Sequence, residues 1–461
     1  MLELGIIIIY FIIVIGLGIS SFRKNWRLEE YLVAGRRYST FFIAGSLLAT
    51  IIGGSATIGL AGLGFSRGLS GAWWLLVGSL GLIVLGLFFA HKVRSYGLYT
   101  LPQLITKQYN QRVGTAASIL IVVAWIGVTA GQILAAGKIL GALGLGSPTL
   151  WMVIFTLIFL GYTLFGGQYA IIRTDILDIV VIWGGILTAL GVVLWKVGGV
   201  SGLMATIPAD RFSFPLSVNF SAADLLSYLI LIGLTYVVGP DMYTRLFCAK
   251  DGTTARKSTF WAAGLLIPFA FCITLIGMGA LALFPKIAAE QAFPTLITNL
   301  FPPLAAAVVL AALVSAVMST ASATLWSAST TLSVNLIQPL QKKRGNVKTI
   351  NWSRWGMLAI GLVALGLALT LNNVISTLLF AYTIYTCGVI IPVIAGFYRK
   401  RLKVTSTAAF AAIIGGGLCG LASKLWTFPF RMDLIAVGIS VLLLASISFI
   451  ENHLSVKKPL F

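Results

Sequence analysis

The chain has 461 residues, of which 59% are hydrophobic and 10% are charged, and its mean hydropathy is +1.00. A water-soluble domain carries about 25% charged residues, so this composition excludes a soluble protein and predicts an integral membrane protein. The formal net charge of +20 does not indicate nucleic acid as a partner, because the basic residues collect in the short segments between apolar stretches.

Apolar stretches of about 20 residues, enough for a helix to cross a hydrocarbon core of about 30 Å, recur from one end of the chain to the other. None alternates with the short period of an outer-membrane barrel. We therefore expect one transmembrane domain over residues 1–461, an all-α membrane protein. Its 13 predicted transmembrane helices begin near Glu3, Tyr38, Ser70, Gln111, Ser147, Asp175, Ala223, Arg256, Pro302, Asn351, Asn373, Thr405 and Asp433.

The basic residues predict how the chain crosses the membrane. If the loops alternate between the two sides, 25 of the 32 Lys and Arg residues fall in one set of loops and the C-terminal tail, and 7 fall in the other. Cytoplasmic loops carry the excess of Lys and Arg. We therefore expect a multi-pass protein of the cell (inner) membrane, with its N-terminus outside and its C-terminus in the cytoplasm.

The first residues are interpreted as a retained helix over 3–22, because they lack the basic start and the small-residue cleavage site of a signal peptide. The four cysteines are scattered without paired spacing, and the two histidines lie far apart in the sequence. We therefore expect no disulfide and no metal cofactor.

Two predicted spans contain helix-weakening residues at membrane depth. Gly53, Gly54 and Ser55 interrupt the second span, and the sequence GLTYVVGP at 233–240 interrupts the seventh. Broken helices are tolerated there only where the freed backbone lines a cavity or is buried in protein. Two breaks five spans apart indicate an inverted-repeat transporter with its site near the midplane. The expected repeats are 38–197 and 223–398, and two further helices follow within 405–450.

Hydroxyl residues crowd the apolar segment 310–331, LAALVSAVMSTASATLWSASTT. Ala316, Ser319 and Thr320 stand at helical spacing i, i+3, i+4, so a carbonyl and two hydroxyls can converge on one helix face. Polar groups inside a bilayer need partners, and an alkali cation is one such partner. The alternative is that each hydroxyl bonds back to the preceding helical turn.

Three further motifs accompany this segment. They are SLLATIIGGSATIGLAGLGFSRG at 46–68, YTLFGGQYAIIRTDILD at 162–178 and GPDMYTRLFCAKD at 239–251. In this order, the four segments resemble the sodium/solute symporter family, which includes transporters of proline, pantothenate, sugars, sialic acid and short carboxylates. The resemblance implies a LeuT-like five-plus-five fold with one helix before the core and two after it. It also implies transport by alternating access with Na⁺ as the coupling ion and no other cofactor.

The resemblance implies a sodium site between the first broken helix and the hydroxyl-rich helix. Its ligands would be backbone carbonyls of Ala49, Ile52 and Ala316 and the hydroxyls of Ser319 and Thr320. The chemistry agrees independently, because a break frees carbonyls and hard oxygen donors suit a hard cation.

Charged residues suggest further roles. By resemblance to sialic-acid transporters, Asp175 and Ser322 are candidates for a second sodium site, although Ala323 replaces one of its hydroxyls. The alternative for Asp175 is an ion pair with Arg173 or another nearby base. Asp241 and Arg245 stand at i, i+4, where their charges can support one another, and we interpret them as gating or structural residues.

The predicted substrate cavity contains small residues, aromatic rings and a few hydroxyls. Such a cavity suits a small, partly apolar solute better than a hexose, so an amino acid or a short monocarboxylate is favoured. The candidate substrate residues are Ser55, Ala56, Thr57, Trp73, Thr235, Tyr236, Tyr382, Thr383 and Tyr385.

These observations predict a sodium-coupled symporter that imports a small organic solute. Its partners would be the solute, Na⁺ and the lipid bilayer; the oligomeric state is left open. The alternatives are a proton-coupled transporter of the same fold, a sugar or vitamin symporter, and a non-transporting solute sensor. Proton coupling is disfavoured because we expect no carboxylate near the centre of any span. An enzyme is not expected, because no nucleophile and base are recognisable together.

Overall fold

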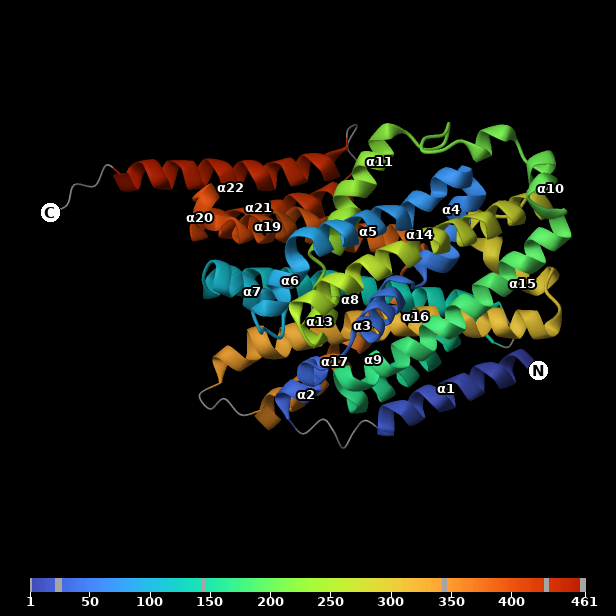
Figure 1. Cartoon of the computed structure of the whole chain (residues 1–461), viewed down its shortest axis with the longest axis horizontal. Helices are drawn as coiled ribbons and strands as arrows, with labels where there is room; N and C mark the ends of the chain where they lie inside the picture. Colours follow the sequence, from blue (N-terminus) through green and yellow to red (C-terminus); the bar gives the residue numbers. More distant parts are fainter. Residues whose placement is uncertain are drawn as a thin grey trace.

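The computed structural model describes residues 2–20, 27–142, 144, 146–341, 346–426 and 431–456, and in this part of the chain the regular structure is helical, without named strands. Most of the long helices run along the horizontal axis of Figure 1. The helices of the first half of the chain are α1 (Leu2–Ser20), α2 (Leu28–Val33), α3 (Thr40–Ile51), α4 (Leu60–Arg67), α5 (Trp73–Val84), α6 (Ala90–Ser95), α7 (Leu101–Gln108), α8 (Gln111–Gly141), α9 (Pro148–Val197) and α10 (Gly199–Thr206).

The second half of the chain continues the bundle. Its helices are α11 (Ala222–Tyr228), α12 (Leu234–Val237), α13 (Pro240–Cys248), α14 (Gly252–Leu283), α15 (Ala292–Asn299), α16 (Pro303–Thr331), α17 (Asn346–Ala368), α18 (Val374–Tyr385), α19 (Ile391–Phe397), α20 (Arg399–Leu402), α21 (Ser406–Leu425) and α22 (Met432–Val456).

Eleven helices in the described residues are long and apolar enough to cross a membrane. Two of them are long enough for two crossings: Ser55–Ser95 has 41 residues and α9 has 50, and at about 1.5 Å per residue the latter would be about 75 Å long. Gly167, at φ 61° and ψ −170°, is not helical and divides α9 into two helices. The second of these begins near Gln168. Asp175 therefore lies two turns inside this helix, whereas the sequence suggested that the helix begins at Asp175. The number 13 stays a prediction.

Both predicted helix breaks are present. α3 ends at Ile51, and Ile52 has φ −82° and ψ 84° before helical structure resumes at Ser55. In the second break, Val238 (φ −130°, ψ 40°) and Gly239 (φ −79°, ψ 130°) separate α12 from α13. The two breaks stand in the first helix of each predicted repeat, while the repeat boundaries themselves stay a prediction.

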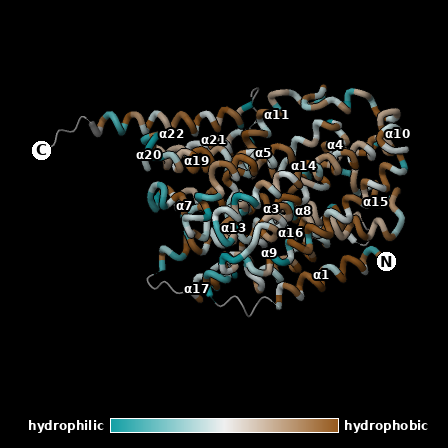
Figure 2. Tube along the Cα trace, viewed as in Figure 1, coloured by the Kyte–Doolittle hydropathy of each residue, from teal (hydrophilic) through white to brown (hydrophobic). Residues whose placement is uncertain are grey.

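The two ends of the molecule differ in polarity. In Figure 1, α1 begins at the right-hand end and α22 ends at the left-hand end, as an odd number of crossings requires. The basic helices α7 and α20 lie at the left-hand end, where hydrophilic segments gather in Figure 2. Which end faces the cytoplasm stays a prediction.

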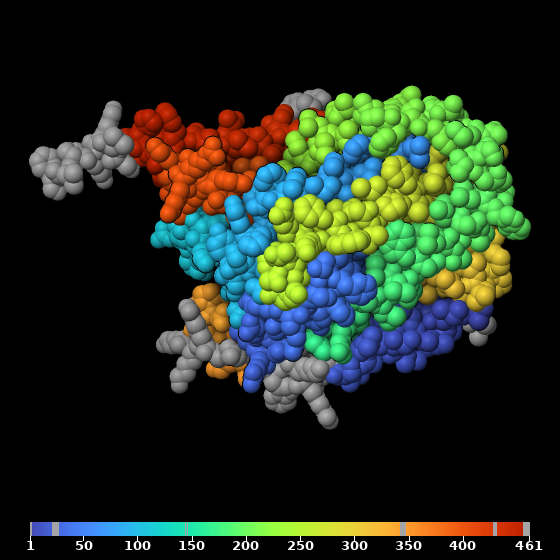
Figure 3. All heavy atoms as spheres, viewed as in Figure 1, coloured from blue at the N-terminus to red at the C-terminus, as the bar shows by residue number. Residues whose placement is uncertain are grey.

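α16 forms the centre of the bundle. It packs against α8 and α9, and its residues 309–331 are all buried. α1 and α22 are peripheral, with Ile12 63% and Leu442 68% exposed, as helices facing lipid would be. On the face seen in Figure 3, α21 and α22 form one edge of the molecule. One connected hydrophobic core nevertheless reaches from Ile7 to Leu444, consistent with one transmembrane domain.

Candidate functional site

The end of α3 meets the middle of α16. The Ser319 hydroxyl oxygen lies 2.8 Å from the Ala49 carbonyl oxygen and 3.0 Å from that of Ala316. The Thr320 hydroxyl oxygen lies 3.0 Å from the Thr50 carbonyl oxygen and 3.3 Å from that of Ala49. The structure therefore brings together four of the five groups predicted for the sodium site.

The helix break explains why these carbonyls are available. The last turn of a helix leaves carbonyls without intrahelical partners, and α3 ends one residue before Ile52. The fifth predicted group is the Ile52 carbonyl. It does not point along the helix axis, because Ile52 has a ψ of 84° instead of the helical value of about −42°. Gly53 permits the close approach of α16, since a Cβ there would lie 2.6 Å from the Thr320 hydroxyl oxygen.

The chemistry of this cluster suits a small hard cation. Its donors are neutral carbonyl and hydroxyl oxygens, the ligand type that hard cations prefer. Ala49, Ala316 and Ser319 are fully buried. Their oxygens have lost contact with water, so a bound cation would replace the lost polar interactions. Each hydroxyl has one proton, so it donates to one neighbouring carbonyl at a time and keeps lone pairs for an ion.

A small cavity of about 20 Å³ adjoins the cluster, about the room that one water molecule needs. Four predicted substrate residues line it: Ser55, Thr235, Tyr236 and Tyr382. The protein thus closes tightly around the predicted site. The other lining residues are Thr50, Ile51, Trp125, Val128, Gln132, Asp241, Met242, Thr320 and Thr324.

Three predicted substrate residues near the first break lie outside this lining. Ala56 is fully buried, and the Thr57 hydroxyl donates to the Gly53 carbonyl at 2.9 Å. The Trp73 ring stacks on Phe214, and its Nε1 donates to the Pro215 carbonyl at 2.9 Å. In this structure the three side chains lie outside the lining of the cavity, and their role in binding the solute stays a prediction.

Two predicted residues of α18 also have other partners. The Thr383 hydroxyl donates to the Leu379 carbonyl at 2.7 Å, in the preceding turn. The Tyr385 hydroxyl donates to the Val238 carbonyl in the second break, and its ring meets Trp125 edge-on. Tyr385 therefore satisfies a freed backbone group, and neither side chain lines the cavity.

Gln132 of α8 also lines the site, although none of the sequence motifs includes it. Its Oε1 accepts a hydrogen bond from the Gly54 N–H at 2.8 Å, and the side chain lines the cavity. An amide in the middle of an apolar span is costly unless it has a hydrogen-bond partner. The position of Gln132 in such a span was therefore a sequence signal for a functional or structural role. Gln132 connects α8 to the first break.

Asp175 is an interior residue. Its Oδ2 accepts a hydrogen bond from Ser46 and lies 3.4 Å from the Arg245 Nη2, with both members of this ion pair fully buried. Arg245 thus forms its ion pair with Asp175 across the fold, and its charge also acts on Asp241, one helical turn away. Asp241 stands in the first turn of α13 and faces the cavity, whereas Arg245, one turn on, reaches α9. The alternative of an ion pair with a nearby base is thus confirmed for Arg245 and not for Arg173, which lies over the Tyr169 ring.

A second buried carboxylate was missed. Asp178 lies one turn beyond Asp175, and its Oδ1 accepts hydrogen bonds from the Tyr10 hydroxyl at 2.7 Å and the Ser315 hydroxyl at 2.8 Å. It is 1% exposed. The helix starts earlier than expected, which places Asp178 further inside it. The expectation that no carboxylate lies near the centre of a span stays a prediction. Ser322 donates to the Ser319 carbonyl, and a second sodium site at Asp175 and Ser322 stays a prediction.

Asp241 contributes an acidic group to the cavity. Its Oδ1 accepts a hydrogen bond from the Met242 N–H at 3.1 Å, at the N-terminal end of α13. None of the ion pairs among the described residues includes it. The cavity therefore offers a carboxylate beside hydroxyls, an amide and aromatic rings.

Comparisons with known proteins identify the family. The model of the sodium:solute symporter family matches residues 31–416. A sodium/glucose cotransporter of Vibrio parahaemolyticus is 25% identical, over 90% of this chain and 83% of its own. The high-affinity proline transporter PutP of Bacillus subtilis is 26% identical over 87% of each chain.

A solved structure shares the fold. A Na⁺-coupled sialic acid symporter, in a substrate-bound outward-open state, superposes with a TM-score of 0.85 at 16% identity and covers 98% of both chains. This neighbour supports the LeuT-like architecture. Because the family model covers most of the chain, the protein belongs to the sodium:solute symporter family, whose members are transporters and not enzymes.

Proposed function

We propose that this protein is a sodium-coupled symporter that imports a small organic solute, with amino acids as the favoured class. The observation that carries the proposal is the cluster of Ala49 and Ala316 carbonyls with the Ser319 and Thr320 hydroxyls at a broken helix beside a cavity. Sodium coupling in the family supports it. The charge pattern supports an N-terminus outside and a C-terminus in the cytoplasm.

Two residues belong to both the ion cluster and the cavity. The Thr320 hydroxyl donates to the carbonyls at the end of α3, and Thr320 and Thr50 both line the cavity. An ion at the cluster would fix the position of α3 against α16, and a solute would touch the same side chains. Binding at one site then favours binding at the other, typically by about 1 to 3 kcal/mol.

Sodium entry supplies the driving force. One elementary charge moved across the membrane releases about 2.3 kcal/mol per 100 mV, before any concentration gradient is added. Alternating access requires that the cavity open to one side at a time around this fixed site. The cavity of about 20 Å³ holds no room for an organic solute, so the bundle must open for the solute to enter.

Asp241 favours an amino acid over a monocarboxylate. A solute ammonium would give this carboxylate a charge-assisted hydrogen bond and would face the Trp125, Tyr236 and Tyr382 rings, which attract cations. A monocarboxylate would bring a second negative charge to the same small space. A hexose would need more directional hydrogen-bonding groups than this lining provides.

The test is uptake into proteoliposomes. Labelled amino acids, short carboxylates and sugars are offered under an inward sodium gradient and under a matched potassium gradient. We expect sodium-specific accumulation of an amino acid, and Asp241→Asn should abolish it while Na⁺ still stabilises the purified variant. Sodium-driven uptake of only uncharged or anionic solutes would refute the substrate class. Equal uptake with potassium would refute sodium coupling.

One observation favours proton coupling as the second candidate. Asp175 and Asp178 lie buried together, with Arg245 as the cation that pairs with Asp175. If both carboxylates ionise, one negative charge stays uncompensated, which is costly in an apolar interior. A proton or a second Na⁺ would balance it. Solute uptake driven by a pH gradient without sodium, retained in Ser319→Ala and lost in Asp178→Asn, would establish this alternative.

A further inference from the structure

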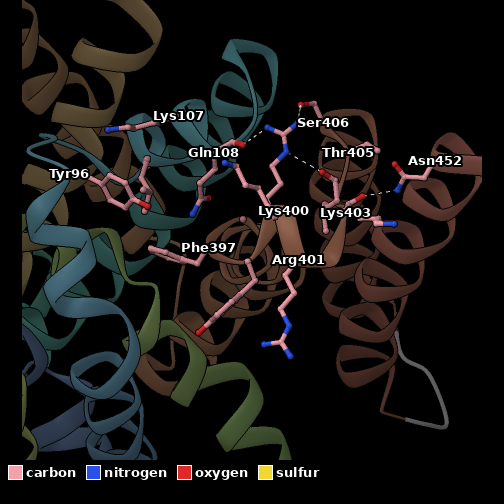
Figure 4. A pocket seen from close by; sticks show the side chains of 15 residues that line it. Tyr96, Lys107, Gln108, Phe397, Lys400, Arg401, Lys403, Thr405, Ser406 and Asn452 are labelled. Carbon is pink, nitrogen blue, oxygen red and sulfur yellow. Dashed lines mark hydrogen bonds between the residues drawn. The ribbon is translucent and has the colours of Figure 1, made fainter. Parts of the chain in front are cut away.

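A basic pocket lies at the end of the molecule where α7 and α20 meet (Figure 4), and it shares no lining residue with the central cavity. Its volume is about 1100 Å³, and no acidic residue is among those that line it. The five basic residues of the lining come from α7 and the region of α20: Lys107, Arg399, Lys400, Arg401 and Lys403.

The five cations have different roles. Arg399 donates to the carbonyls of Gln108 and Val404, so it holds the wall of the pocket together. Lys400, Arg401 and Lys403 are exposed, and none of them belongs to an ion pair among the described residues. These three charges are therefore available to an anion.

An apolar groove of about 1090 Å³ continues from the basic pocket, between α19 and α22. The two share Tyr398, Lys403, Val404 and Asn452, and the Asn452 amide donates to the Lys403 carbonyl at 2.8 Å where they join. The groove beyond this junction is lined mainly by aliphatic and aromatic side chains of the two helices.

The groove has the length of one lipid leaflet. Along α22 it extends from Asn452 back to Val441, which is about 16 Å at about 1.5 Å per residue, and α19 lines the opposite side from Ile391 onward. Half of a hydrocarbon core of about 30 Å is about 15 Å. A chain lying in this groove would start at the basic pocket and reach the bilayer midplane.

We propose that the pocket and groove together bind an anionic phospholipid. Its phosphate lies at the basic pocket, where Lys400, Arg401 and Lys403 supply the positive charge, and one acyl chain lies along α19 and α22. A soluble anion would make no use of the apolar groove, and a neutral lipid would leave three cations without a counter-charge. Basic pockets between membrane helices recognise anionic headgroups in this way. The proposal does not depend on the identity of the transported solute.

The first arm of the test measures lipid binding to the purified full-length protein by native mass spectrometry. Phosphatidylglycerol and phosphatidylcholine with the same acyl chains are compared. Wild type should retain phosphatidylglycerol preferentially, and the triple variant K400Q/R401Q/K403Q should bind it at least about tenfold more weakly, since each basic group near the surface contributes to the attraction. No preference for phosphatidylglycerol in wild type would overturn the proposal.

The matched control is K250Q/R256Q/K257Q, which removes the same net charge near the start of α14, where no basic pocket joins an apolar groove among those described. Lys250, Arg256 and Lys257 are exposed. The control should bind phosphatidylglycerol within about twofold of wild type. An equal loss in both triple variants would show attraction by net charge alone and overturn the site.

The second arm tests the groove. Ala445 lines it and is exposed, whereas its exposed neighbour Ser446 does not line it. Ala445→Trp should fill the groove and weaken phosphatidylglycerol binding severalfold, while Ser446→Trp should leave it unchanged. Unchanged binding in Ala445→Trp, together with full competition by inorganic phosphate, would show a site for a soluble anion and overturn the lipid proposal.

Discussion

Ser319 provides the sharpest test of the ion cluster. Ser319→Ala removes the hydroxyl that lies 2.8 Å from the Ala49 carbonyl oxygen and 3.0 Å from that of Ala316. The rest of the cluster stays, because Thr320 also reaches Ala49 at 3.3 Å. The variant should therefore fold and bind solute but hold sodium more weakly.

The size of the effect follows from one lost oxygen. A hydrogen bond to a charged group contributes about 1.5 to 3 kcal/mol, and we take an oxygen–cation contact in a buried site as comparable. Since about 1.4 kcal/mol is tenfold in affinity, the sodium concentration for half-maximal uptake should rise between about tenfold and 150-fold. Thr320→Ser keeps its hydroxyl and should remain close to wild type.

The assay is solute uptake into proteoliposomes as a function of sodium concentration. Ser329→Ala is the matched control: Ser329 is buried in the same helix, and its hydroxyl donates only to the Trp326 carbonyl in the preceding turn. The control should keep the wild-type sodium dependence. An unchanged sodium dependence in both Ser319→Ala and Thr320→Ala would refute the assignment of the cluster.

Three further variants test the surroundings of the site. Gly53→Ala places a Cβ 2.6 Å from the Thr320 hydroxyl oxygen, so it should abolish the stabilisation by sodium in thermal unfolding; a normal sodium shift would contradict the close contact. Arg245→Met leaves Asp175 buried without its cation and should cost about 3 to 5 kcal/mol, seen as a lower melting temperature that Asp175→Asn partly restores; no loss would show that the ion pair is unimportant. Tyr385→Phe leaves a buried carbonyl of the second break unsatisfied and should cost about 1 to 3 kcal/mol, and an unchanged melting temperature would argue against that role.

The ion cluster was predictable because its chemistry is local. Ser319 and Thr320 stand at helical spacing from Ala316, so the sequence alone places their side chains on one face. Gly53 and Gly54 mark the break that supplies the opposing carbonyls. The only long-range step was the meeting of α3 with α16, and the resemblance to the symporter family implied it.

The charged residues were less predictable because their partners lie far away in sequence. The i, i+4 spacing places Arg245 near Asp241, but the ion pair that Arg245 forms is with Asp175, 70 positions away. The helix boundary set by Gly167 decides how deep Asp175 and Asp178 lie. Composition and spacing do not contain that boundary, since it depends on one glycine adopting φ 61°.

Only some of the predicted substrate residues line the cavity, and the sequence could not show which ones. A hydroxyl or an indole near a helix break can line a cavity or satisfy the backbone, and the sequence does not distinguish the two uses. Thr57 and Tyr385 bond to carbonyls at the two breaks, whereas Ser55 and Tyr382 line the cavity. Gln132 was missed because it belongs to none of the motifs, although an amide in an apolar span calls for a partner.

The central claim is that sodium at the cluster and a solute in the cavity bind cooperatively. The most direct measurement is a pair of titrations on the purified protein, solute binding at several sodium concentrations and sodium binding at several solute concentrations. Linkage requires that each ligand raise the affinity for the other by the same factor, typically about 5-fold to 150-fold. We expect equal factors with sodium and no effect with potassium. Solute binding that does not depend on sodium would contradict it.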